Sequence, residues 1–456
     1  MSIKLDWEVE AEEPRVFEAG EDPSSRRERR RARLWVVLVI LGTLAVFAGI
    51  ALVIGLRLRA VNEQVEQALV SAVDAEVAAL RIGDQTSFLN AQRSATGDWL
   101  NVQQQTFNNY QTMKQNGNIQ LTGRVLETAF EGPRAWAKVE EIVDGIPYAR
   151  LWFYWRYDDG WRHVPPDYTF WGAAQTASAD GVAVRYRAVD EALAQSMATS
   201  LESWLLYGCE VLACGELPAI NVEIVPDRAA MLGWVAGDDW RLQVPSPYID
   251  RARYDMPFET GLQLQVANLI AERLVALATG GMQPQYPADV YYLRSAVVSW
   301  LVGRFAQVNT NSFLVSSLAA NYSDQAVGQL TRAMQPASDA TLLNSAAGTS
   351  TLDAANLDWR DLLTWRLALE AELIARREEA NFLTLYDTRD GAARDLAYQR
   401  YNAGTPAEQR VVASVQPGVG EDGSAVLNAV VEVGGDPARQ ETVLFRLVDG
   451  VWRRAN

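Results

Sequence analysis

The sequence contains one histidine and two cysteines in 456 residues, and this scarcity excludes several kinds of site. A structural zinc site needs four cysteine or histidine ligands. The two cysteines and His163 together supply only three. A catalytic triad needs a histidine beside its nucleophile, and no Gly-x-Ser-x-Gly motif accompanies His163. We therefore predict no metal site, no cofactor and no histidine-based catalysis.

The sequence also lacks the common nucleotide-binding and calcium-binding loops. No Walker loop occurs, no Gly-x-Gly-x-x-Gly follows a strand-like segment, and no Asp-x-Asp-x-Asp-Gly loop is present. Paired carboxylates are the remaining catalytic candidates, and neighbouring residues on a strand point to opposite faces. We therefore interpret the adjacent acidic pairs as turn and surface residues: Asp158-Asp159, Asp238-Asp239 and Glu140-Glu141.

Charge is distributed unevenly along the chain. The net charge is −16, and residues 60–456 carry 48 acidic against 31 basic residues, a net charge of −17. Nucleic acids and anionic lipids both attract basic surfaces. We therefore expect no nucleic-acid partner for residues 60–456, and no flat binding of this part to anionic lipid.

One long hydrophobic run is present at residues 34–56, which contain no charged residue. At 1.5 Å per residue these 23 residues form a helix of about 34 Å, enough to cross a bilayer core of about 30 Å. Six arginines precede the run within residues 26–33, and only Arg57 and Arg59 follow it closely. The positive-inside rule then predicts a cytoplasmic N-terminus and an extracytoplasmic body in the cell membrane.

The segment before the run is too long and too acidic for a cleaved signal peptide, so we interpret the run as an uncleaved signal anchor. Residues 1–33 are expected to form a disordered cytoplasmic tail whose arginines lie against anionic headgroups. An alternative is that Leu5, Trp7 and Val9 form a docking motif for a cytoplasmic partner.

Cys209 and Cys214 are separated by four residues, unlike the two-residue spacing of thioredoxin-type redox pairs. An extracytoplasmic location would permit a disulfide between them. The alternative interpretation is two small buried thiols.

Residues 60–172 have the pattern of helices followed by antiparallel strands. Apolar residues recur at helical spacing from 61 to about 90, and a second helix is expected from about 99 to 113. Strand-like segments follow from 119, with Asp144-Gly145 and Asp158-Asp159-Gly160 at hairpin turns. This α+β pattern, ending in Trp155, Gly160 and Trp161, resembles the SnoaL-like, nuclear transport factor two-like cone domains.

The resemblance implies a curved sheet wrapped around a helix, with a cavity that some members use for ligands or catalysis. Catalytic members often place an Asp/His pair in that cavity. His163 follows the last turn near a strand end, and we interpret it as a structural or exposed residue.

The end of the chain has a similar closing hairpin at Asp449-Gly450 and Trp452-Arg453. A helix is expected at about 359–386 and a strand at 423–433. We predict a second, smaller cone-like domain at 378–456, and two unrelated cores capped by tryptophans are the alternative.

Residues 173–377 have a different pattern, with short strands followed by helices at about 258–278 and 290–305. This order resembles the thermolysin-like gluzincin metallopeptidases, in which a helix carries His-Glu-x-x-His. Gln265, Val266 and Leu269 stand where that motif would lie, and Ser295 stands near the third ligand. The resemblance therefore implies a degenerate peptidase-like domain without zinc chemistry, between an N-terminal and a C-terminal cone-like domain.

Aromatic residues crowd the segment from 152 to 171. Alternation along a strand would send Trp152 and Tyr154 to one face and Phe153 and Trp155 to the other. We predict an aromatic pocket or, preferably, an interdomain interface. Its residues are Trp152, Tyr154, Trp155, Trp161 and Trp171.

These observations favour a non-enzymatic, membrane-anchored scaffold or sensor that binds a protein, peptide or small ligand outside the cell. One alternative is a hydrolase that acts through carboxylates, without histidine, in a cone-domain cavity. Another is a transmembrane regulator that signals to a cytoplasmic partner through residues 1–33.

Overall fold

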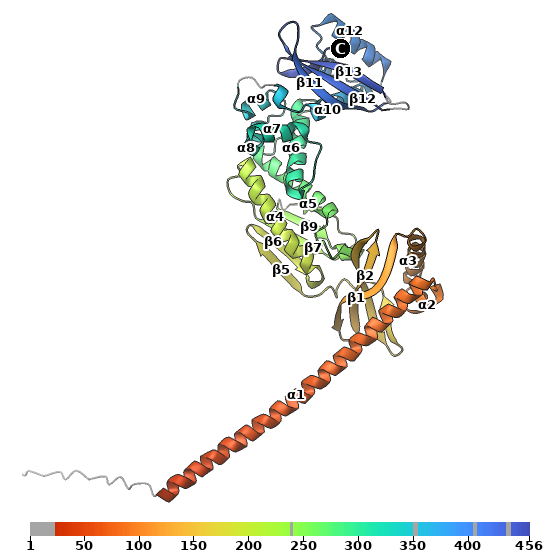
Figure 1. The fold of residues 1–456 in the computed structure, drawn as a ribbon, viewed down its shortest axis with the longest axis vertical. Coiled ribbons are helices and arrows are strands. Elements are labelled where there is room, and N and C mark those ends of the chain that lie inside the picture. Colours follow the sequence, from red (N-terminus) through yellow and green to blue (C-terminus); the bar gives the residue numbers. More distant parts are fainter. Residues whose placement is uncertain (1–22, 238–239, 350–353, 405–407, 435–438) are drawn as a thin grey trace, which may run out of the picture.

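The computed structural model describes residues 23–237, 240–349, 354–404, 408–434 and 439–456. These residues form a mixed α+β structure with one N-terminal helix that is long and apolar enough to cross a membrane. In Figure 1 this helix projects from one end of an elongated body, and the C-terminus lies at the other end. The acidic tail at residues 1–22, including the predicted docking motif, lies outside the described residues.

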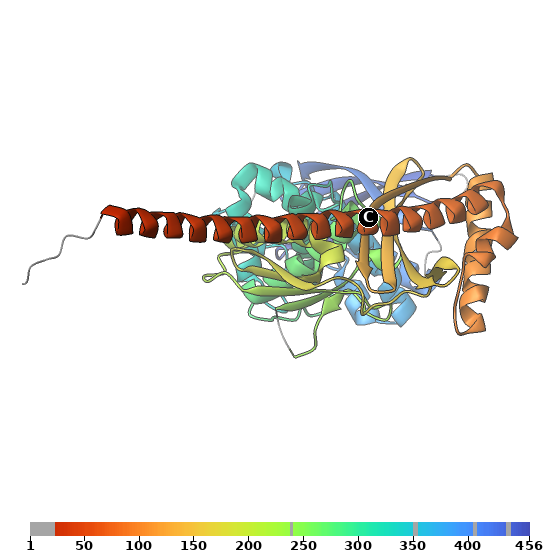
Figure 2. The same cartoon turned by 90° about the horizontal axis from the view of Figure 1, so that it is seen from below.

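The first helix, α1 (Pro23–Ile82), is continuous from the arginine-rich segment through the hydrophobic run into the body. Figure 2 shows it as one long, straight rod. Its apolar side chains from Leu34 to Leu58 are exposed, whereas Leu69 and Val73 are completely buried. Residues 23–33 were expected to be disordered and are helical instead. Proline suits the first turn of a helix, and the arginines, glutamate and alanine after it favour helix.

An N-terminal unit packs around the last turns of α1. Gly83, at φ 78°, ends α1, so the single helix expected from 61 to 90 is two helices. An antiparallel sheet follows, in which β10 and β4 both pair with β3. The elements after α1 are α2 (Gln85–Asn90), α3 (Gly97–Gln115), β1 (Ile119–Glu131), β2 (Arg134–Val143), β3 (Ile146–Tyr157), β4 (Gly160–Val164) and β10 (Ala252–Arg253).

A middle unit combines a five-stranded sheet with a group of helices. The strand order is β5-β6-β7-β9-β8, with β6, β7 and β9 parallel. Its strands are β5 (Ala174–Ala179), β6 (Val182–Arg187), β7 (Ile220–Val225), β8 (Gly233–Trp234) and β9 (Arg241–Pro245). Its helices are α4 (Glu191–Leu212), α5 (Thr260–Ala278), α6 (Asp289–Ala306), α7 (Phe313–Tyr322), α8 (Asp324–Ala333) and α9 (Leu342–Ala346). Short 3-10 turns occur at Ala188–Asp190, Pro247–Ile249 and Ala354–Asn356.

A C-terminal unit closes the chain with three helices and a meander of antiparallel strands, ordered β11-β12-β13-β14. The helix expected at 359–386 is broken at Arg377, which adopts a left-handed conformation with φ 61°. The elements are α10 (Arg360–Arg376), α11 (Glu379–Thr384), α12 (Gly391–Ala403), β11 (Arg410–Val419), β12 (Ala425–Val433), β13 (Arg439–Val448) and β14 (Val451–Arg454).

The C-terminal unit repeats the element order of the N-terminal unit. The end of α10, all of α11 and the start of α12 occur at the same intervals as the end of α1, all of α2 and the start of α3. A constant offset in residue number relates Leu69 to Leu363, Glu76 to Glu370, Phe88 to Phe382 and Gly97 to Gly391. Both units then continue into four antiparallel strands.

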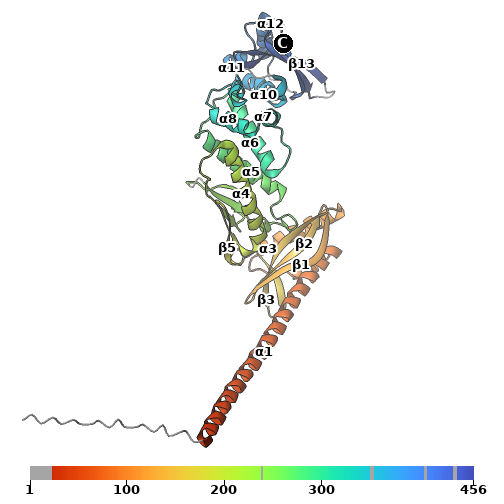
Figure 3. The same ribbon diagram turned by 60° about the vertical axis from the view of Figure 1, so that its left-hand side comes forward.

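Two large cores hold the body together, and Figure 3 shows the units following one another along its length. Leu69, Val73 and Leu80 of α1 pack against Trp152 and Tyr154 inside the N-terminal unit. The second core runs continuously from the sheet and helices of the middle unit to one face of the C-terminal sheet. The predicted domain limits at 60–172, 173–377 and 378–456 stay predictions.

Candidate ligand cavity

The N-terminal unit contains a partly enclosed cavity of about 280 Å³ between α1, α3, β3 and β4. Two residues of the middle unit, Arg228 and Ile249, complete its wall. Pockets at the junction of two packed units are common positions for small ligands. Polar and aromatic side chains in its lining include Glu76, Trp99, Gln103, Arg150, Trp152 and His163.

Glu76 is the centre of a buried hydrogen-bond network at the inner end of the cavity. Its Oε1 accepts from Gln92 Nε2 at 2.7 Å and lies 2.7 Å from His163 Nδ1. Its Oε2 accepts from Tyr154 at 3.0 Å. An ionised carboxylate only accepts hydrogen bonds, so we assign the hydrogen of the histidine pair to Nδ1. Both carboxylate oxygens are therefore occupied by protein donors.

His163 is buried, at 7% exposure, and faces this cavity. Its ring stacks on Trp152 at 5.3 Å and on Tyr154 at 5.2 Å, and meets Trp99 edge-on at 5.5 Å between centroids. The aromatic rings and Glu76 thus hold the imidazole in one orientation. The interpretation of His163 as an exposed residue is wrong, while a structural role fits these contacts.

A second polar group lies beside the first. Tyr110 donates to the carboxylate of Glu141 and accepts from Arg150 Nη1 at 2.8 Å. Burial raises the pKa of Tyr110, so its hydroxyl stays protonated over the physiological range. Arg150 lines the cavity and has further N–H groups besides the one that meets Tyr110.

Two hydrogen-bonding side chains in the cavity wall have no described partner. Gln103 is only 6% exposed, and no hydrogen bond of its amide is found among the described residues. The indole Nε1 of Trp99 is buried and likewise lacks an acceptor in that part of the chain. A buried polar group without a partner is costly, by about 1–3 kcal/mol. The Gln103 amide is therefore suited to meet water or a ligand in the cavity, whereas Trp99 Nε1 has no accessible surface and would reach a ligand only after its ring turns.

The joint between the N-terminal and middle units has its own buried polar cluster. Asp190 is inaccessible to solvent and accepts from Trp171 Nε1 at 3.0 Å and from Ser246 Oγ at 2.5 Å. Lys138 donates to the carbonyl of Val189 at 3.2 Å. Burial raises the pKa of Asp190 to about 6. This cluster fixes the segments that carry the middle unit's side of the cavity wall.

The aromatic residues singled out from the sequence separate into several positions. Trp152 lines the cavity, and Tyr154 donates to Glu76. Trp161 packs in the N-terminal core, and Trp171 packs with Phe153 in a cluster next to the middle unit. Trp155 is 40% exposed. The set therefore contributes to the cavity, the core and the joint, and does not form one surface.

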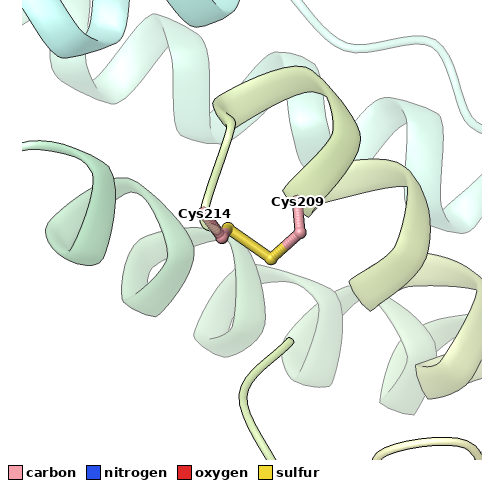
Figure 4. Close-up of a disulfide and its surroundings, with 2 residues drawn as sticks. All are labelled: Cys209 and Cys214. Atoms are coloured by element: carbon pink, nitrogen blue, oxygen red, sulfur yellow. A yellow bond between two sulfur atoms is a disulfide. The ribbon is translucent and has the colours of Figure 1, made fainter. Parts of the chain in front are cut away.

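Cys209 and Cys214 are joined by a disulfide, shown in Figure 4. Cys209 lies in the last turn of α4. The chain leaves the helix at Ala213, which adopts a left-handed conformation with φ 54° and reverses the chain direction. This reversal brings the Cα atoms within 4.8 Å of each other. The bridge closes the end of α4 and lies away from the cavity wall.

Comparison with protein-family models, with curated proteins and with solved structures finds no match to this chain.

The positions aligned with the peptidase motif do not converge on a site. Gln265 is exposed on α5, Val266 is completely buried in the core, and Ser295 donates to the carbonyl of Tyr292 in its own helix. Within the described residues no group of three or more His, Cys, Asp and Glu side chains is arranged to hold a metal ion.

The acidic pairs behave differently from one another. Asp158 and Asp159 lie in the β3–β4 turn as expected, whereas Asp238 and Asp239 lie outside the described residues. Glu140 and Glu141 were interpreted as surface residues, and this is wrong because both are buried, at 6% and 0% exposure. Glu140 accepts from the hydroxyl of Tyr254, and this partner keeps the pKa of Glu140 low.

Glu76, Gln103, Trp99 and Arg150 were not predicted as site residues. One signal for Glu76 is present in the sequence, because it falls on the same helical face as Val73, Val77 and Leu80. A charged residue within an apolar stripe indicates a buried polar contact. Trp99, Gln103 and Arg150 carry no such signal, because the residues around them become neighbours only when the sheet has folded.

Proposed function

We propose that the protein is a non-enzymatic, membrane-anchored sensor or binding protein that holds a small ligand in the cavity of its N-terminal unit. The observation that supports this proposal is the partly enclosed cavity with buried Gln103 and Trp99 Nε1 in its wall, neither with a described partner. A largely preformed apolar pocket with a few polar groups is typical of small-molecule sites.

We place the cavity outside the cell membrane. Six arginines precede the hydrophobic run of α1 and two closely follow it, which favours a cytoplasmic N-terminus. The body that would then be extracytoplasmic carries the disulfide between Cys209 and Cys214, a bond typical of oxidising compartments.

The path from the cavity to the membrane is a single helix. Glu76 and the hydrophobic run both lie on α1, which is unbroken from Pro23 to Ile82. A ligand that moves Glu76 would therefore move the spanning segment with it, and would act on a cytoplasmic partner of residues 1–33. A protein or peptide partner of the body would act through the same helix.

The family assignments belong to the proposal as well. Helices followed by a four-stranded meander, with a polar cavity, fit a SnoaL-like cone domain at 60–172, and the repeated element order fits a smaller cone-like domain at 378–456. Parallel strands followed by helices fit a degenerate gluzincin-like domain at 173–377.

A comparison of the two repeated units favours binding over catalysis. Glu370, the counterpart of Glu76, is met by Arg454 at 3.1 Å. His163 and Arg454 occupy corresponding positions in the two sheets, because each forms an isolated bridge to the second residue after the short helix of its unit. Arginine remains protonated in proteins and does not act as a base. The carboxylate–cation contact is therefore a shared structural feature, and His163 needs no catalytic role to explain it.

The alternative is an enzyme. Glu76 is a buried carboxylate in the cavity wall, as a carboxylate hydrolase would require, but His163 lies 2.7 Å from it. An enzyme in this cavity would thus employ a histidine–carboxylate pair as acid and base, in place of carboxylates alone. Conversion of a bound compound, abolished by His163→Gln with binding retained, would favour this alternative.

A fragment screen with the full chain in lipid nanodiscs tests the binding proposal. The fragments should include anions, cations and neutral compounds, and ligand-observed NMR should report their binding. We expect hits that Gln103→Phe abolishes, since the larger side chain fills the cavity. Gln104→Phe is the matched control because Gln104 is the exposed neighbour on α3. The proposal fails if no fragment of any charge binds, or if every hit is insensitive to Gln103→Phe.

A further inference from the structure

Some hydrogen-bonding groups of the cavity wall have partners within the protein, and others have none among the described residues. The carboxylate of Glu76 accepts from Gln92, Tyr154 and His163, so its acceptor capacity is taken up inside the protein. The Trp99 Nε1–H and the amide of Gln103 remain without a described partner. The Gln103 amide offers both a donor and an acceptor, whereas Trp99 Nε1 and the remaining N–H groups of Arg150 are donors only, so donors predominate among these lining groups.

The charged side chains that line the cavity are mainly basic. Arg150 lines the cavity and gives one described hydrogen bond, to Tyr110, from a guanidinium with five N–H groups. Arg228 stands exposed at the rim contributed by the middle unit. The lining thus holds these two cations and one carboxylate, Glu76, while Glu141 and Asp250 lie near Arg150 outside the lining. A locally positive cavity in an acidic protein would attract anions selectively.

The remainder of the wall is aromatic and apolar. Phe88, Trp99, Trp152 and Tyr168 contribute rings, and Val102 and Leu151 contribute aliphatic surface. A volume of about 280 Å³ is sufficient for a compound with one or two rings. Such walls favour a flat hydrophobic ligand body, because aromatic pairs gain from offset or edge-on contacts.

We propose that the cavity binds a small organic anion, with its carboxylate toward Gln103, Trp99 Nε1 and Arg150 and its ring against the aromatic wall. This inference rests on the proposed function of the cavity and specifies its ligand class. His163 adds one further ring nitrogen, Nε2, besides the Nδ1 that meets Glu76, and the Gln103 amide and the two arginines supply more hydrogen-bonding groups than this single atom.

The donors are arranged on two elements that the fold holds firmly. Trp99 and Gln103 are four residues apart, so they lie on one face of α3. Arg150 lies on the central strand β3, next to Leu151 and Trp152. A ligand carboxylate would thus be held between a helix and a sheet that share one core.

The test compares benzoate, benzamide and benzylammonium, which share a ring and differ in charge. Titration of the full chain in nanodiscs, followed by tryptophan fluorescence and calorimetry, should show benzoate binding at least about tenfold more tightly than benzamide, since hydrogen bonds to a charged group are stronger than those to a neutral group. Benzylammonium should bind most weakly.

Three variants locate the binding. Gln103→Glu places a negative charge in the wall and should weaken benzoate at least about tenfold, whereas Gln104→Glu on the exposed face should not. Trp99→Phe keeps a ring, removes the N–H and should weaken benzoate more than benzamide. Thermal unfolding of each variant in nanodiscs checks that it is folded.

The outcomes separate this inference from the function on which it rests. Equal or tighter binding of benzamide or benzylammonium would overturn the anion class and leave a ligand-binding cavity in place. Failure of benzoate in a protein that binds other fragments would do the same. Failure of all three compounds, together with an empty fragment screen, would remove both proposals.

Discussion

Asp190 is a buried carboxylate at the joint between the N-terminal and middle units. It is inaccessible to solvent, and its two described donors, Trp171 and Ser246, come from different parts of the chain. Burial outweighs these donors and raises its pKa to about 6. The ionised form is therefore disfavoured in the folded protein compared with the unfolded chain.

The stability of the protein should depend on pH through this residue. Because the folded pKa lies above the ordinary value near 4, the contribution of Asp190 is fully present below pH 4 and is lost as the pH rises to about 6. A shift of this size corresponds to roughly 3 kcal/mol. Asp190→Asn removes the ionisation, so its melting temperature relative to wild type should rise between pH 4.5 and pH 7.

Asp395→Asn is the control, since that side chain is 82% exposed. Melting curves of the full chain at a series of pH values provide the measurement. If the Asp190→Asn variant and the wild type showed parallel pH dependences, ionisation of Asp190 would not limit stability.

At the scale of elements, the crossing of α4 and α8 depends on a glycine. A Cβ atom added to Gly328 would lie 1.8 Å from the carbonyl oxygen of Val211, which is backbone and has little freedom to move. Val211 lies between the two cysteines of the disulfide at the end of α4. The two helices therefore approach more closely than any larger residue would permit.

Gly328→Ala should force the helices apart. Overpacking of this kind costs about 1–3 kcal/mol or more, which outweighs the gain of up to about 1 kcal/mol from the better helix former. Gly261→Ala, in the first turn of α5 with only a flexible Glu259 side chain nearby at 3.6 Å, should be neutral or stabilising. Thermal unfolding of both variants distinguishes them, and equal melting temperatures would contradict the close approach.

Another feature of the elements is the tie between the first helix of each repeated unit and its last strand. Glu76 meets His163 in the N-terminal unit, and Glu370 meets Arg454 in the C-terminal unit. Both acids are fully enclosed, and a buried carboxylate that loses its partner is strongly destabilising. Each contact therefore holds a helix to the sheet edge from the inside.

At the scale of the whole molecule, α1 connects the hydrophobic run directly to the folded body. Its 60 residues would measure about 90 Å as a straight helix. About a third of that length is apolar and long enough to cross a bilayer, and the last turns form part of the N-terminal core. The body is thus attached through its own core helix, without a flexible linker.

Orientation should depend on the arginines before the hydrophobic run. Substitution of Arg26, Arg27, Arg29, Arg30, Arg31 and Arg33 by glutamine leaves Arg57 and Arg59 as the nearest charges, and a detectable fraction of molecules should then insert in the opposite orientation. A reporter enzyme fused after Asn456 measures the side reached by the body. Substitution of Glu8, Glu10 and Glu12 by glutamine should have little effect, because acidic residues contribute weakly to orientation. An unchanged orientation in the arginine variant would show that these residues do not set the orientation, and a reporter on the cytoplasmic side in the unsubstituted chain would refute the proposed sidedness.

Much of the local structure could be predicted because it depends on contiguous residues. The hydrophobic run and the strands β1 to β4 lie where apolar runs and alternation indicated them. Local reasoning was less successful at helix ends. Gly83 and Arg377 both adopt positive φ, and nothing around the arginine distinguishes it from a residue inside a helix.

The sequence by itself determined the apolar segment that is long enough to span a membrane and the acidic character of the body, since both depend on composition within one stretch of chain. The cavity was decided only by the tertiary structure. Glu76, Gln103, Arg150 and His163 come from four different elements, and Arg228 belongs to another unit. Their proximity follows from the pairing of β3 with β4 and from the packing of α1 and α3 against that sheet, which are long-range contacts that no local pattern encodes.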